Sequence, residues 1–178
     1  LETSSGVNEY RSTGNQGVKL KTPEAEIVDV KVLREDGEPS FAFFQHSKII
    51  IAIRVLIKGQ LANPAVWLRF TRADGVIATS WLSHEPELWD IGTLQPGENT
   101  INVEAEDLML GDGTYFLTVA LFPHKSGGDA AFYADPLCMW DGVIQIEVKR
   151  RTRPLATVFD QPMRIKGGDT RRSRDGTN

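Results

Sequence analysis

The sequence lacks the features of disulfide-rich, membrane-spanning and secreted proteins, which leaves the class of compact globular domains. It has one cysteine in 178 residues, Cys138, so an internal disulfide is excluded, paired-cysteine zinc patterns are absent, and a reducing compartment is favoured. Its longest strongly apolar run, Ile49 to Ile53, is far too short to span a bilayer, and no secretory signal follows Leu1. Because Leu1 is not a methionine, we expect the sequence to be an excised piece of a longer protein or to carry added residues at its start.

The sequence also lacks the short motifs of common enzymes. It contains no GxxxxGK[ST], GxGxxG, GxSxG or HExxH, so no phosphate-binding loop or serine nucleophile elbow is predicted. We expect Cys138 to be buried and unreactive. Glu85 and Glu87 could act as an acid and base pair for glycoside hydrolysis, but two glutamates around a proline are more typical of a solvated loop. With His84 and Asp90 they match no metal-ligand spacing, so we predict no enzyme, no metal and no cofactor.

Negative charge is concentrated in the body of the chain. The net charge is −4, but residues 1–148 carry 11 Lys and Arg against 21 Asp and Glu, whereas residues 149–178 carry 9 against 3. The body therefore has a charge of −10 and the tail +6. An acidic body argues against nucleic-acid binding, which needs a basic surface. We interpret the basic tail as a solvated terminus, with contact to phosphate or an acidic partner as the alternative.

Hydrophobic periodicity predicts an all-β fold. The strongest strand is 48–57, in which every second residue from Ile49 to Ile57 is apolar and β-branched. A short helical turn is the only helical structure we expect, within 104–110. Seven short strands separated by DG, PG and similar turns predict an antiparallel β-sandwich of the immunoglobulin-like or jelly-roll kind. The other six predicted strands are 26–33, 65–71, 76–81, 100–105, 114–122 and 143–150.

Composition divides the chain into four parts. Residues 1–22 are rich in Ser, Thr, Asn and Gly and predict a flexible leader, after which the sandwich domain occupies 23–150. Strand-like content returns in 151–166, which we interpret as an additional or exchanged strand. Residues 167–178 predict a disordered basic tail.

The aromatic residues suggest a binding surface. Trp67 shares the polar face of its strand with Arg69, and Trp81, Trp89, Tyr133 and Trp140 lie at strand ends or in loops that could gather at one edge. Aromatic rings stack on the C–H faces of sugars, while neighbouring polar groups bond the hydroxyls. The alternative for any single tryptophan is that it covers the end of the core. The predicted ligand-binding residues are a polar sheet face of Arg54, Trp67, Arg69 and Gln145, and a loop rim of Trp81, His84 and Trp89.

The order of these segments resembles a known family. The succession runs "AEIVDVKVLREDGEPSFAFFQHSKIIIAIRVLI", "PAVWLRFTRADGVIATSW", "IGTLQPGENTINVEAEDLMLGDGTYFLTVALF" and "GVIQIEV". It is similar to the C-terminal carbohydrate-binding domain of Wzt, the nucleotide-binding subunit of ABC transporters that export O-antigen polysaccharide. The resemblance covers roughly residues 24–165. Its motifs identify the scaffold, so no sugar-binding residue is carried over from the family.

The resemblance implies a function. It implies a non-catalytic module that follows an ATPase domain absent from this sequence and binds the non-reducing, often capped, end of an undecaprenyl-linked O-antigen glycan. The location would be cytoplasmic, at the inner face of the bacterial inner membrane, with the missing domain contacting the transporter's membrane subunit. It also implies a homodimer that can exchange a C-terminal strand, 154–165, although the basic break at 149–153 departs from a simple continuation. The alternative is a protein-interaction sandwich that docks a transporter or partner subunit without binding sugar.

Overall fold

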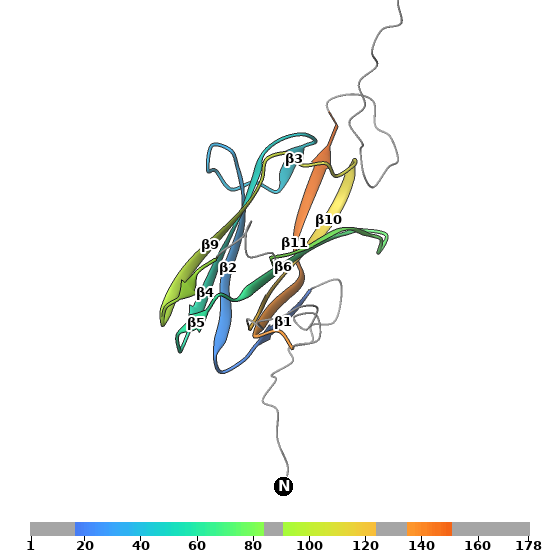
Figure 1. Cartoon of the computed structure of the whole chain (residues 1–178). Helices are drawn as coiled ribbons and strands as arrows, with labels where there is room; N and C mark the ends of the chain where they lie inside the picture. Colours follow the sequence, from blue (N-terminus) through green and yellow to red (C-terminus); the bar gives the residue numbers. More distant parts are fainter. Residues whose placement is uncertain (1–16, 84–90, 124–134, 151–178) are drawn as a thin grey trace, which may run out of the picture.

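The computed structural model of the chain describes residues 17–83, 91–123 and 135–150. Within these ranges the chain forms eleven strands and no helix (Figure 1). The described residues therefore contain no helix long and apolar enough to cross a membrane. The strands are β1 Val18–Lys21, β2 Ala25–Arg34, β3 Ala42–Phe44, β4 Ile49–Ile57, β5 Leu61–Ala62, β6 Ala65–Arg72, β7 Ile77–Leu82, β8 Thr93–Leu94, β9 Gly97–Ala105, β10 Gly113–Phe122 and β11 Cys138–Lys149.

The strands form two main sheets that pack face to face. The larger sheet has the order β1-β11-β10-β6-β7, and β3 pairs in parallel with the C-terminal end of β11. The smaller sheet has the order β2-β4-β9, and β5 and β8 form a separate two-stranded ribbon. Figure 1 shows β2, β4 and β9 on one side of the molecule and β10 and β11 on the other. All other pairings are antiparallel, which confirms the predicted β-sandwich.

Alternation along the strands builds the core between the two sheets. In β4 the side chains alternate, as predicted, so that Ile49, Ile53 and Ile57 are all at most 3% exposed. β10 contributes to the same core, with Tyr115 and Leu117 fully inaccessible. The Tyr115 hydroxyl keeps a partner in the core, because it donates a hydrogen bond to the Gly111 carbonyl. The period-two pattern thus identifies the inner face of β4.

The ends of the sandwich differ from the prediction in three places. β1 lies within the residues expected to form a leader, and it is ordered because it pairs with the start of β11. β11 begins at Cys138 rather than near 143, since its first residues pair with both β1 and β10. The turn expected to be helical, 104–110, contains no helix, and Leu108 and Leu110 are buried against the core instead. Short strands such as β3 escape a periodicity search because three residues do not establish a period.

Cys138 is expected to resist alkylation in the folded protein. It is fully buried, and burial raises the pKa of its thiol to about 12, so the reactive thiolate is scarce near neutral pH. We expect iodoacetamide at pH 8 to label the native protein at least about 100-fold more slowly than the urea-unfolded protein. Mass spectrometry of timed samples measures both rates. Equal rates would contradict a buried, unreactive Cys138.

Candidate functional site

The outer face of the larger sheet carries an aromatic and polar cluster. Trp67 and Arg69 are outward residues of β6, as the sequence predicts, and both are partly exposed. The Trp67 indole donates a 2.6 Å hydrogen bond from Nε1 to the hydroxyl of Ser80 on β7. Its ring also meets Phe122 edge to face, with centroids 6.4 Å apart, and the Arg69 guanidinium lies 5.0 Å from its centroid. Contacts from three strands therefore fix the orientation of the indole.

Arg69 is held by a carboxylate from two strands away. Its Nη2 donates to Asp141 Oδ1 at 2.7 Å and lies 3.4 Å from the hydroxyl of Thr118 on β10. The Thr118 hydroxyl in turn donates to the same Asp141 oxygen at 2.6 Å. Both bonds end on Oδ1, so Asp141 Oδ2 remains an acceptor on a side chain that is 38% exposed. The cluster thus links β6, β10 and β11 and presents an oriented carboxylate beside an aromatic ring.

A β-bulge explains why Asp141 points to this cluster. Between the pairs Leu117–Ile144 and Val119–Trp140 the register shifts, so Thr118 alone stands opposite three residues of β11. Such bulges bend a strand and redirect a side chain. The bulge needs glycine: Gly142 has a φ of 63°, where other residues are strained. Its backbone N–H donates to the Thr118 hydroxyl, so Thr118 positions both the bulge and the carboxylate.

The neighbouring β1 strand also approaches this bulge closely. A Cβ at Gly17 would lie 2.1 Å from the carbonyl oxygen of Asp141 and 2.5 Å from the backbone nitrogen of Val143. No side chain fits at that distance, because backbone atoms cannot move aside as a flexible side chain can. The residue just before β1 therefore supports the conformation that aims Asp141.

Gln145 belongs to the same face as this cluster. It is an exposed residue of β11 and stands opposite Phe116, two positions along β10 from Thr118. We define the outer aromatic face as Trp67, Arg69, Thr118, Asp141 and Gln145. The structure thus brings together three of the residues that the sequence predicts and adds two that it does not.

Arg54 lies on a different sheet. It is an outward residue of β4, in the centre of the smaller sheet, with its nearest charged partner Asp29 at 4.0 Å. The single polar face expected from Arg54, Trp67, Arg69 and Gln145 is therefore divided between two sheets. Alternation distinguishes inner from outer residues of a strand, but it does not tell which sheet the strand joins.

Trp81 and Trp140 do not gather with Trp67. Trp81 pairs with the buried Leu68, so it points to the inner side of β7 rather than to the outer aromatic face. Trp140 also packs against the core, but on β11, where Lys19 of β1 lies 3.5 Å above its ring. β10 and β6 separate β11 from β7 in the sheet. The remaining candidate residues of the predicted rim and loops lie outside the described residues: His84, Glu85, Glu87, Trp89, Asp90 and Tyr133.

The chemistry of the outer aromatic face suits binding of a neutral polar ligand. Arg69 and Asp141 compensate each other's charge, and the indole offers an apolar surface beside hydrogen-bonding groups. Within residues 17–83, 91–123 and 135–150, no three His, Cys, Asp or Glu side chains are grouped as a metal site requires. The sequence signal for Thr118 and Asp141 is weak, because Thr118 is a small polar residue in an apolar strand and Asp141 precedes the predicted strand.

Comparisons with known proteins identify the scaffold. The family model of the Wzt C-terminal domain matches residues 19–160. A crystal structure of the C-terminal domain of Wzt has the same fold, with a TM-score of 0.73 and 13% identity over 89% of this chain and 91% of that chain. A Niemann-Pick type C2 protein from Japanese carpenter ant is more distant, with a TM-score of 0.46 and 6% identity over 72% and 95% of the two chains.

The curated proteins contain no match. The family model nevertheless spans most of the described strands, from β1 to the end of β11, and the matching solved structure covers the same domain. The chain therefore belongs to the Wzt C-terminal domain family, a family of non-catalytic domains with a carbohydrate-binding role in polysaccharide export.

Proposed function

We propose that the outer aromatic face binds the non-reducing end of an O-antigen glycan, capped or uncapped, for export by an ABC transporter. The observation that carries this proposal is the Arg69–Thr118–Asp141 hydrogen-bond cluster beside the oriented indole of Trp67. A sugar ring can stack on the indole while its hydroxyls reach the carboxylate oxygen that internal contacts leave open. The family's role in polysaccharide export supports a glycan as the ligand.

The organisation of the cluster favours recognition over catalysis. The Asp141 carboxylate is held by two hydrogen bonds, and no second carboxylate of the described residues shares the cluster. Glycoside hydrolysis requires two carboxyl groups on either side of the bond that is cut. A fixed charge pair next to a ring instead suits a site that holds one sugar in one orientation, because little side-chain freedom is lost on binding.

The proposal extends to the setting of the domain. One stacked ring contributes about 0.5 to 1.5 kcal/mol, so a single site binds weakly. A homodimer would present two such faces and raise the avidity for a polymer carried on a membrane. In this proposal the dimer acts at the cytoplasmic face of the bacterial inner membrane, joined through an ATPase domain to the transporter's membrane subunit.

Substitution of Trp67 tests the proposal. We expect Trp67→Ala to weaken binding of the source strain's O-polysaccharide by about two- to tenfold, because the stacking surface is lost. Trp67→Phe should retain most of the affinity, since it keeps a ring and loses only the bond to Ser80. Isothermal titration calorimetry measures both, with intact polysaccharide compared with fragments that lack the terminal residue.

The control removes an exposed ring from another part of the sheet. Phe41 is 70% exposed beside β3, and Phe41→Ala should leave glycan affinity unchanged. The proposal is wrong if the wild-type domain binds neither form of the polysaccharide, or if Trp67→Ala binds as tightly as wild type. Preference for the intact end over internal fragments would support end recognition, and equal affinity for both would contradict it.

A further inference from the structure

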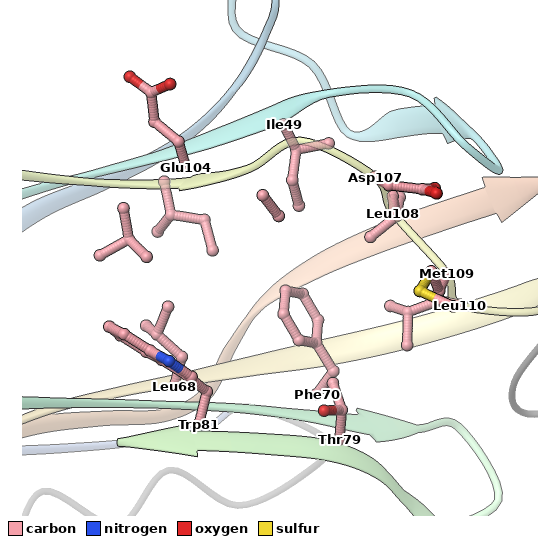
Figure 2. Close-up of a pocket in the computed structure, with 13 residues that line it drawn as sticks. Ile49, Leu68, Phe70, Thr79, Trp81, Glu104, Asp107, Leu108, Met109 and Leu110 are labelled. Atoms are coloured by element: carbon pink, nitrogen blue, oxygen red, sulfur yellow. The ribbon is translucent and has the colours of Figure 1, made fainter. Parts of the chain in front are cut away.

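A second site of different character lies between the sheets. A cavity of about 320 Å³ opens along the side of the sandwich where the edge strands β7 and β9 face each other. Figure 2 shows Phe70 and Trp81 extending from one sheet toward Ile49 on the other. The outer aromatic face lies on the opposite side of the larger sheet, so the two sites are separate.

The walls of the cavity are apolar and fixed. Ile49, Leu68 and Leu110 are each at most 4% exposed, so they belong to the packed core rather than to a mobile surface. The segment after β9 is tied to the rest of the fold by paired backbone bonds: His46 N–H donates to the Leu108 carbonyl, and Leu108 N–H donates to the Ser47 carbonyl. The cavity is thus a formed part of the sandwich, and its volume falls within the range of ligand pockets.

The charged residues at the cavity turn away from it. Figure 2 shows the Glu104 carboxylate pointing away from the space between the sheets. That carboxylate pairs with Lys48 at 2.5 Å, and Asp107 lies 2.9 Å from His46 Nδ1. Among the described residues, the cavity lining therefore offers hydrocarbon surface, two aromatic rings and the side chain of Thr79, but no free charge directed at a ligand.

We propose that this cavity binds the uncharged alkyl chain of a small ligand. Water in such a space makes few hydrogen bonds, so an alkyl group that displaces it gains the favourable transfer of apolar surface. A charged group would lose its hydration without gaining a partner. The ligand's polar end would remain at the mouth, in solvent. This inference does not depend on glycan binding, because it uses none of the residues of the outer aromatic face.

A series of straight-chain alcohols tests the proposal. We expect isothermal titration calorimetry with butanol to octanol to show saturable binding of one molecule per domain. The affinity should rise about fourfold per methylene until the chain fills the cavity, and then level off. In methyl NMR spectra the signals of Ile49, Leu108 and Leu110 should shift on addition of octanol.

Variants on β9 provide a matched pair. Ala105 lines the cavity, whereas Asn102 is an exposed residue of the same strand on its outer side. Ala105→Leu should fill part of the space and weaken octanol binding at least about tenfold, and Asn102→Leu should leave it unchanged. Should Ala105→Leu fail to fold, as thermal unfolding would reveal, Val103→Leu provides the same test from the neighbouring inward position.

The outcomes distinguish this inference from the glycan proposal. Trp67→Ala should bind octanol as wild type does, whatever its effect on the polysaccharide. The inference is overturned if octanol does not bind saturably, if affinity is independent of chain length, or if the cavity-filling variants bind octanol as tightly as wild type.

Discussion

Replacing Asp141 by asparagine is expected to weaken glycan binding by about 10- to 100-fold. Hydrogen bonds to a charged group contribute about 1.5 to 3 kcal/mol, which corresponds to this range of affinity. Both internal bonds, from Arg69 and Thr118, end on Oδ1, so an asparagine can keep them with its amide oxygen and then presents the donor Nδ2 where the open acceptor Oδ2 was. The variant therefore removes both the ligand acceptor and the charge that holds Arg69. Calorimetric titration with the O-polysaccharide measures the loss.

Glu147→Gln is the matched control for this variant. Glu147 is an exposed carboxylate of the same strand, with Lys149 at 3.4 Å, and it lies outside the Arg69–Thr118–Asp141 cluster. We expect its affinity for the polysaccharide to stay within about twofold of wild type, because exposed ion pairs contribute little. Equal losses in the two variants would indicate a general charge effect, and an unchanged affinity in Asp141→Asn would remove Asp141 from the site.

The sequence correctly predicts the inner and outer residues of a strand where period-two alternation alone decides them. In β4, strict alternation of apolar residues predicts which side chains enter the core, and the structure confirms it for Ile51 and Ile53. The same rule places Trp67 and Arg69 on the outer side of β6, where the structure has them. β4 pairs with β9 without interruption, and Trp67 and Arg69 lie before the register shift that follows Phe70 in β6, so the period of two holds at these positions.

Period-two alternation does not predict where a strand is irregular, nor which strands pair with one another. Asp141 reaches the site through a bulge that inserts extra residues into β11, and no period-two pattern anticipates a change of register. Arg54 satisfies the rule for an outward polar residue, yet its strand pairs with β2 and β9 rather than with β6. Strand order depends on tertiary packing among segments distant in sequence, which explains why the face could be predicted only in part.

The centre of the smaller sheet is where a truncation should destabilise the fold most. Ile53 is 1% exposed in the middle strand, and its direct neighbours across the sheet are Val30 and Ile101, both buried. Ile53→Ala removes buried methyl and methylene groups and leaves a cavity that rigid neighbouring strands cannot close. We expect the free energy of unfolding to fall by about 2 to 5 kcal/mol. Urea denaturation followed by tryptophan fluorescence measures the change.

Arg54→Ala changes the adjacent residue on the opposite side of the same strand and so isolates the effect of burial. The Arg54 side chain is 48% exposed and lies 4.0 Å from Asp29, so its removal should alter the free energy of unfolding by no more than about 0.5 kcal/mol. Because β4 belongs to the smaller sheet, this variant should also bind the polysaccharide with wild-type affinity. A loss of binding in Arg54→Ala at unchanged stability would instead place the glycan on the smaller sheet and contradict the assignment to Trp67, Arg69 and Asp141.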